Sequence, residues 1–362
     1  MAALTPPASN LALPLATPKF TRTPLWSFPK CHVTKREIIN SLWGLGSGPS
    51  RMVFNGINYD SYFSYYVEQC NLALHDGERH ISSKSHQDII DIAAQIRSQV
   101  KYEDIKAWLS SNLPSPRLEN EEEQINGSIA LAARLLCMIS LGELQNGFSG
   151  QERLIWSENS LERWIKDYFN APRILDNECV KLEKIFNARN LGRIAGIEIQ
   201  FTDNLADHLR LRSEDDKKVA IFHHASFLTS QRQSSLFPDG FIDETIRTLA
   251  LLFPQSDPKT RKWFRRLSKR SNLDCQAVKC DRLRAIDRRI DNFAFWRDRL
   301  VVLKQVFDEA EPSTLSQWWC DRRNEVQWYT FWVAILVLIL TLVFGLVQCI
   351  EGALQIYTAS HP

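Results

Sequence analysis

The stretch "WYTFWVAILVLILTLVFGLV" (residues 328–347) decides the architecture that the sequence predicts. Residues 326–350 contain no charged side chain, and as a helix rising ~1.5 Å per residue they are about 37 Å long. That length crosses a hydrocarbon core ~30 Å thick with some tilt, so we predict one transmembrane helix over residues 326–350 and a short tail over residues 351–362. The candidate transmembrane residues at its near end are the aromatic Trp328, Tyr329 and Trp332, which favour the membrane interface. Those in its far half are Phe344 and Gly345.

The charges around this span predict its orientation. Arg322 and Arg323 precede it and no Lys or Arg follows it, so the positive-inside rule places the N-terminal side in the cytosol. The first 30 residues contain six prolines and no apolar run long enough for the core of a secretory signal. We therefore predict a single-pass, tail-anchored membrane protein. The endoplasmic reticulum or another endomembrane is the expected location, and the mitochondrial outer membrane is the alternative.

The composition is that of a globular protein and favours no particular soluble ligand. Hydrophobic residues make up 44% and charged residues 24% of the chain, and the net charge is +2. Its 8 cysteines are scattered, which fits a reducing compartment, and the spacing of Cys275 and Cys280 does not match a zinc site. We expect no cofactor, no bound metal and no nucleic-acid partner.

The sequence in front of the span predicts a mainly α fold with a small β element. We expect a disordered, Pro-rich arm over residues 1–50 and a helical region over residues 51–113. An acidic linker (114–127), a mostly helical core domain with the β element (128–311) and a juxtamembrane helix (312–325) follow.

Hydrophobic periodicity places the individual elements of this fold. Apolar spacing predicts one helix over residues 85–109 and a buried helix over residues 128–142. A capping box from Asn159 to Glu162 predicts the start of a helix that ends near Phe169. Two strands are expected in "GIEIQFT" (196–202) and "KKVAIFHH" (217–224), followed by a helix in "DETIRTLALLF" (243–253).

A long apolar stripe extends from Leu283 to Phe307. Its members are spaced three and four residues apart, which predicts one amphipathic helix of about seven turns. We interpret the stripe as packing on its own domain. A coiled-coil seam in a homo-oligomer is the alternative.

Three histidines lie near the predicted strands, namely His208, His223 and His224. Neighbouring residues on a strand point to opposite faces, so His223 and His224 are not expected to share one metal ion. Asp203 and Asp207 supply nearby carboxylates, but no nucleophile elbow or zinc-protease motif accompanies them. We therefore expect structural histidines, no catalytic residues and no enzyme activity.

The run "PKTRKWFRRLSKRSN" (258–272) is basic and amphipathic. Asp257 followed by Pro258 predicts the start of a helix, and no acidic residue interrupts the cations before Asp274. We interpret the run as a solvated face packed on the domain through Trp263, Phe264 and Leu267, and a helix that lies on an anionic bilayer is the alternative. The candidate membrane-surface residues are Arg261, Lys262, Trp263, Phe264, Arg265 and Arg266.

One cysteine lies close to the predicted span. Cys320 is on its cytosolic side, where cysteines can be acylated, so we regard it as a candidate acylation site.

Several stretches resemble an uncharacterised fungal family of proteins with a C-terminal membrane anchor. They include "FNARNLGRIAGIEIQFTDNLADHLRL" (186–211), "IFHHASFL" (221–228), "STLSQWW" (313–319) and "DRRNEVQWYTFWVAILVLILTLVFGLVQCIEGALQIY" (321–357). The resemblance covers about residues 128–358 and implies a membrane anchor without catalytic residues.

The expected function is therefore that of a cytosol-facing interaction or scaffold module, with the bilayer and cytosolic proteins as partners. A weaker similarity to CorA-type magnesium channels makes a degenerate channel subunit one alternative, although the Gly-Met-Asn loop of those channels is missing from this sequence. A membrane-tethered hydrolase is the other alternative.

Overall fold

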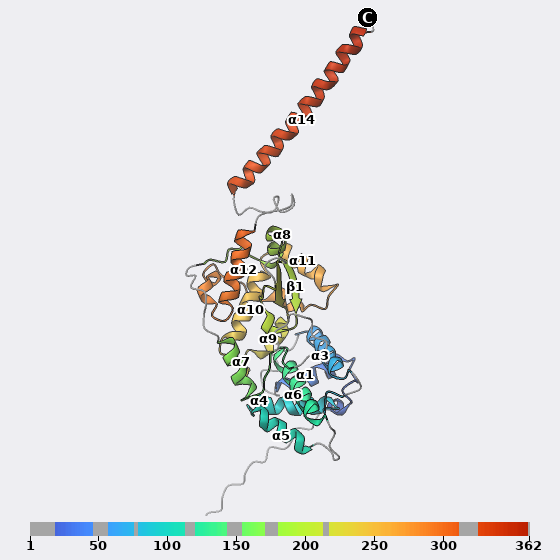
Figure 1. The fold of residues 1–362 in the computed structure, drawn as a ribbon, viewed down its shortest axis with the longest axis vertical. Coiled ribbons are helices and arrows are strands. Elements are labelled where there is room, and N and C mark those ends of the chain that lie inside the picture. Colours follow the sequence, from blue (N-terminus) through green and yellow to red (C-terminus); the bar gives the residue numbers. More distant parts are fainter. Residues whose placement is uncertain are drawn as a thin grey trace, which may run out of the picture.

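The computed structural model describes residues 19–45, 57–75, 79–112, 120–142, 154–170, 180–212, 217–310 and 325–360. Within these ranges the protein is mostly helical, with one small sheet and a separate C-terminal helix (Figure 1). The predicted fold class is confirmed. Cys320 and the expected juxtamembrane helix over residues 312–324 lie outside the described residues, as does the first part of the expected acidic linker.

Part of the arm that was expected to be disordered over residues 1–50 is helical. Residues 19–45 form η1 (Lys19–Arg22) and α1 (His32–Trp43), and Ile38, Ile39 and Leu42 on α1 are fully buried. Gly44 ends α1 with a φ of 67°, a conformation that costs glycine little. The many prolines misled the prediction because they lie outside α1, whose own apolar spacing is helical. Residues 1–18 and 46–50 lie outside the described part of the chain.

Four further helices lie among the described residues of the N-terminal half. They are α3 (Asp60–Ala73), α4 (His86–Arg97), α5 (Tyr102–Asn112) and α6 (Glu121–Cys137). The single helix expected over residues 85–109 is therefore two helices. Gln99 between them has a φ of 61°, which a continuous helix does not allow.

Helix α6 also corrects the expected linker. It begins at Glu121, so residues 121–127 are helical rather than part of a connection between two domains. Glu121, Glu122 and Glu123 occupy its first turn, where negative charge is favoured by the helix dipole. One hydrophobic core extends from Leu25 to Ala310, so the two expected regions share a core.

The small sheet has the two strands that the sequence predicts. β1 (Glu198–Thr202) and β2 (Lys218–Phe222) pair in parallel, with Glu198 opposite Lys218 and Thr202 opposite Phe222. Helix α8 (Ala188–Ala195) immediately precedes β1, and the 3-10 turn η2 (Leu205–Asp207) follows it. Both strands therefore end at the same edge of the sheet.

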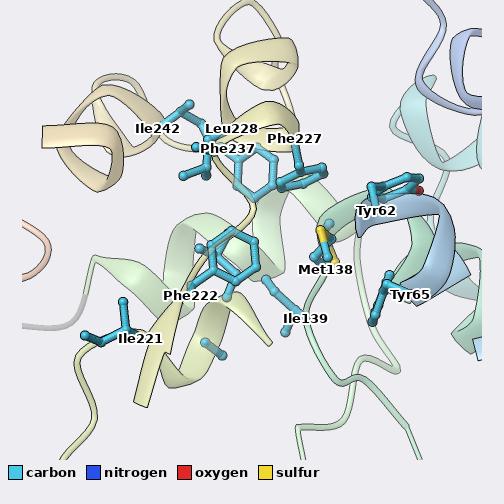
Figure 2. Packing of buried hydrophobic residues seen from close by; sticks show 14 of the residues in the cluster. Tyr62, Tyr65, Met138, Ile139, Ile221, Phe222, Phe227, Leu228, Phe237 and Ile242 are labelled. Atoms are coloured by element: carbon cyan, nitrogen blue, oxygen red, sulfur yellow. The ribbon is translucent and has the colours of Figure 1, made fainter. Parts of the chain in front are cut away.

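Helices α7 (Leu161–Phe169), α9 (Ala225–Gln231), α10 (Phe241–Leu252), α11 (Pro258–Ser268) and α12 (Arg297–Glu309) belong to the C-terminal half. The cap of α7 is Ser160, one residue later than the expected Asn159. Figure 2 shows Phe222, Phe227 and Phe237 packed together in the core. The ring of Phe227 also lies parallel to that of Tyr62 on α3, with 6.1 Å between centroids, and so joins the two halves.

The long helix expected from Leu283 to Phe307 is wrong in its first half. The 3-10 turn η3 (Cys275–Lys279) precedes this region, which contains the 3-10 turns η4 (Ile286–Arg288) and η5 (Ile290–Asn292), and within it only α12 is α-helical. The cause is Glu244 on α10, whose buried carboxylate accepts backbone N–H bonds from Ala294, Phe295 and Trp296 at 2.7–2.9 Å. Those three N–H groups are the ones that a continuous helix would direct to its own carbonyls.

Helix α14 (Glu325–Ser360) is longer than the predicted span and includes most of the expected tail. Its stretch from Trp328 to Tyr357 is long and apolar enough to cross a membrane, and none of its most apolar window is buried in the protein. Figure 1 shows α14 apart from the rest of the fold. This exposure distinguishes α14 from a core helix, because a core helix would bury its apolar residues.

Candidate functional site

A cleft of about 1130 Å³ lies where the N-terminal helices meet the end of β1. Its wall includes Tyr65, Glu68 and Gln69 from α3, Arg134 from α6, and Asp203 just after β1. Clefts of this size commonly hold small molecules or short segments of a partner. The cleft is therefore the candidate binding site of the domain.

The carboxyl ends of the two strands bring three titratable side chains together at this cleft. Asp203 follows β1, and His223 with His224 follows β2. Oδ1 of Asp203 lies 3.3 Å from Nε2 of His223 and 2.5 Å from Nε2 of His224. The histidines are almost fully buried, whereas the Asp203 side chain is 43% exposed. Ligands of open parallel sheets commonly bind at this edge.

The two neighbouring histidines do not point to opposite faces, so that prediction is wrong. Their rings stack with 4.1 Å between centroids. The reason is that the strand geometry ends at Phe222, so His223 and His224 lie in the turn that leads into α9.

Backbone contacts fix the tautomer of His223. The N–H of Asp274 donates to Nδ1 of His223 at 3.2 Å, so Nδ1 is unprotonated and Nε2 carries the hydrogen that points to Asp203. Asp274 is held in turn by the N–H and hydroxyl of Ser226, which donate to its carboxylate at 2.6 and 3.0 Å. Asp203 is therefore positioned through a chain of buried hydrogen bonds.

Burial and these contacts set the charges of the cluster. Burial lowers the pKa of His223 to about 4, so this ring is neutral near pH 7. Burial by itself would raise the pKa of Asp203, but the hydrogen bonds from His223 and His224 outweigh it and hold that pKa below its usual range. The cluster is thus an ionised carboxylate that accepts hydrogen bonds from two imidazoles.

The same cluster has the composition of a metal site, since one ligand atom from each residue lies within 4.8 Å of the others. A histidine that binds a metal through Nε2 donates its Nδ1–H to an acceptor. Here Nδ1 of His223 meets a backbone donor, and Nδ1 of His224 is buried without a hydrogen-bond partner. The hydrogen bonding around the two rings therefore suits imidazoles that donate to the Asp203 carboxylate better than imidazoles that bind a metal ion.

His208, the third histidine singled out by the sequence, has a structural position away from the cleft. It is fully buried, its Nδ1 accepts the N–H of Phe222 at 3.1 Å, and its Nε2 donates to the hydroxyl of Thr248 at 2.6 Å. It therefore joins β2 to α10.

Helix α11 contains the basic run, and it begins with Asp257 as cap and Pro258 in its first turn, as predicted. Phe264 is fully buried against Phe253, with 5.0 Å between their ring centroids, so its expected contact with the membrane is wrong.

Its neighbours on α11 divide between core and solvent. Trp263 packs against the core and Arg261 is half-buried, whereas Lys262, Arg265 and Arg266 are exposed. Within the described residues these three exposed cations form no ion pair, and the ion pairs that are present involve cations outside α11. The helix therefore presents an uncompensated positive face.

The residues predicted for the span lie on α14. Phe344 and Tyr329 are 64% and 63% exposed, and Trp328, Trp332 and Gly345 are only partly covered by the helix itself. Comparison with protein-family models, curated proteins and solved structures gives no match to this chain.

Proposed function

We propose that this protein is a tail-anchored, single-pass membrane protein that holds its helical domain on the cytosolic side as an interaction module. The observation that carries the proposal is the exposed apolar surface of α14, which extends over the stretch from Trp328 to Tyr357. An apolar surface of this extent on a soluble protein is an aggregation hazard, whereas a bilayer buries it.

The charges support the cytosolic orientation. Arg322 and Arg323 precede α14, and Lys and Arg are missing from residues 326–362. A cytosolic domain also fits the free thiols of Cys70 and Cys137, which are buried in the core. An endomembrane, with the endoplasmic reticulum first, is the membrane that we propose.

Helix α11 supports a defined orientation of the domain on the bilayer. The chain leaves the domain at the end of α12, where the ring of Phe307 packs on Phe186, 5.6 Å away. The next residue, Asn187, accepts a hydrogen bond from Thr260 in the first turn of α11 at 3.4 Å. The basic face therefore lies beside the point from which the chain continues to α14, and we propose that it faces anionic headgroups.

Chemical footprinting of the reconstituted full chain tests this orientation. We expect acylation of the exposed Lys259, Lys262 and Lys269 to fall several-fold in vesicles with anionic lipid, and to recover at high salt because the attraction is screened. Lys84 and Lys101 are exposed on the other half of the domain and serve as the control. Equal labelling of both groups in anionic and zwitterionic vesicles would contradict the orientation.

The topology itself is tested by insertion of the full chain into microsomes. We expect added protease to digest the domain, and an acceptor sequon appended after Pro362 to be glycosylated. The natural sequon at Asn126 is a poor reporter because Ser128 is fully buried and donates to the carbonyl of Gln124 inside α6. A protease-protected domain in intact microsomes would overturn the proposal.

The cleft is the observation that favours an interaction module over the two alternatives. A channel subunit needs a pore, and the described residues contain one helix long and apolar enough to span a membrane. A hydrolase that used Asp203 as its base would be weak, because a carboxylate with a lowered pKa accepts protons poorly. Proximity labelling from the domain in cells identifies the partners that the cleft receives.

A further inference from the structure

We propose that the cleft binds a cationic group, the ammonium of a lysine or the guanidinium of an arginine in a partner segment, between the carboxylates of Asp203 and Glu68. This inference rests on the proposed interaction function and names the chemistry that the cleft recognises.

Asp203 is built as a fixed acceptor. Both imidazoles donate to the same oxygen, Oδ1, and among the described residues Oδ2 has no hydrogen-bond partner. The side chain is 43% exposed at the cleft wall. Burial lowers the pKa of His223 to about 4, so this neutral ring orients the carboxylate without cancelling its charge. The buried hydrogen bonds from Ser226 to Asp274 and from Asp274 to His223 hold the His223 ring, and through it the Asp203 carboxylate, in one position.

Glu68 supplies a second carboxylate on the same cleft. Burial and the charge of Asp203 raise the pKa of Glu68, so the two carboxylates lie within electrostatic reach of each other. In the described part of the chain neither one forms an ion pair with a Lys or Arg (His223 and His224 are the partners of Asp203). A cation placed between them would replace repulsion by attraction.

Some of the other polar side chains that line the cleft are paired with each other. Lys106 pairs with Glu122 at 2.6 Å, and His80 pairs with Glu123 at 2.6 Å. Arg134 is buried and donates to the carbonyl of Leu141 at 3.0 Å. Glu103 and Arg212 also line the cleft, and acidic side chains outnumber basic ones along its wall.

An independent observation points to a hydrogen-bonding ligand at the same place. The Gln69 side chain lines the cleft beside Glu68 and is only 8% exposed, yet its Oε1 has no hydrogen-bond donor. A buried acceptor without a donor costs stability in the free protein. Ammonium and guanidinium groups carry several N–H donors, so they match a site made of acceptors.

The experiment measures binding of capped tetra-arginine and tetra-lysine peptides to the full chain in a non-ionic detergent by calorimetry, with tetra-glutamine as the neutral control. We expect Asp203→Asn and Glu68→Gln each to weaken binding about ten- to a hundredfold, because each removes a charge-assisted contact. Glu183→Gln removes an exposed carboxylate outside the cleft and should leave the affinity unchanged.

Two variants, Asp203→Asn and Glu68→Gln, are used so that one folded variant remains if the other unfolds. Asp203→Asn alters a hydrogen-bonded network, but Glu68 is exposed on α3, so Glu68→Gln is expected to fold normally. Unchanged affinity in folded Glu68→Gln, or no binding of either cationic peptide to the native chain, would overturn the inference. Zinc that binds and is lost in Asp203→Asn, without peptide binding, would identify a metal site instead. Protease accessibility in microsomes tests the anchoring separately from all of these results.

Discussion

Replacement of His208 by glutamine tests the buried histidines as the source of acid sensitivity. His208 is fully buried, and its ring meets Trp296 edge-on with 4.8 Å between centroids. Burial, with a smaller effect of Arg299, lowers the pKa of His208 from 6.5 to about 3. The folded protein therefore keeps this ring neutral at a pH where the unfolded chain protonates it.

The sign and size of the effect follow from linkage. Because the unfolded state binds the extra proton below pH 6.5, the stability contributed by neutral His208 is complete above that pH and is lost as the pH falls toward 3. A difference of one pH unit in this window is worth about 1.4 kcal/mol, so His208 should remove about 2–3 kcal/mol of unfolding free energy between pH 6 and pH 4. His223, whose pKa is lowered to about 4, acts in the same direction.

Glutamine retains a donor and an acceptor but does not titrate in this range. We expect His208→Gln to cost about 1–3 kcal/mol at pH 7, through less favourable contacts with Thr248 and Trp296, and to lose about 2–3 kcal/mol less than the native chain on going to pH 4. The assay is urea unfolding of the detergent-solubilised full chain, followed by tryptophan fluorescence. His32→Gln, whose side chain is 79% exposed, is the control. An equal pH dependence in His208→Gln and the native chain would refute the reasoning.

Three further substitutions test the packing of the fold by the same unfolding assay. Glu244→Ala leaves three N–H groups just before α12 without their acceptor, that of Trp296 being buried, and should cost about 3–5 kcal/mol, whereas an unchanged midpoint would contradict its role. Gly127→Ala places a Cβ 1.9 Å from the carbonyl oxygen of His80 and should destabilise by about 1–3 kcal/mol despite the better helix propensity of alanine; Gly192→Ala, with 3.4 Å to its nearest atom, is the matched control. Phe264→Ala should cost about 3–5 kcal/mol without weakening the attraction of α11 to anionic vesicles, and a loss of vesicle contact with normal stability would restore Phe264 as a membrane residue.

The sequence predicted an element correctly where the residues that determine it are neighbours in the chain. The alternation around Ile199 predicted β1, and Asp257 followed by Pro258 predicted the start of α11, because caps and periodicity act over a few residues. The long helix up to Phe307 failed for the opposite reason. Glu244, which interrupts it, lies 50 residues before Ala294 in the chain, and periodicity contains no information about such a contact.

The candidate site could be predicted only in part. Asp203 follows the first predicted strand, and His223 and His224 are the last residues of the second, so parallel pairing of those strands would have placed all three at one edge. Periodicity along each strand does not indicate whether two strands pair in parallel or antiparallel. Glu68 and Gln69 come from α3, far earlier in the chain, and the cleft that joins them to Asp203 depends on tertiary packing.

The packing of β1 on α11 relates the proposed anchor to the proposed binding site. Phe201 lines the cleft near the end of β1, and its ring packs on the buried ring of Phe264 of α11 with 5.7 Å between centroids. Lys262 and Arg266 lie two residues before and after Phe264, so at about 100° per residue they point away from Phe201. If α11 faces the headgroups, the cleft therefore lies at a distance from the lipid, and a cytosolic segment can enter it while the domain rests on the membrane. The same geometry predicts that anionic vesicles, which slow the acylation of Lys262, leave the affinity for tetra-arginine at Asp203 unchanged once peptide adsorbed to the lipid is subtracted. Competition between vesicle contact and peptide binding at the cleft would show that the two surfaces overlap and would contradict this arrangement.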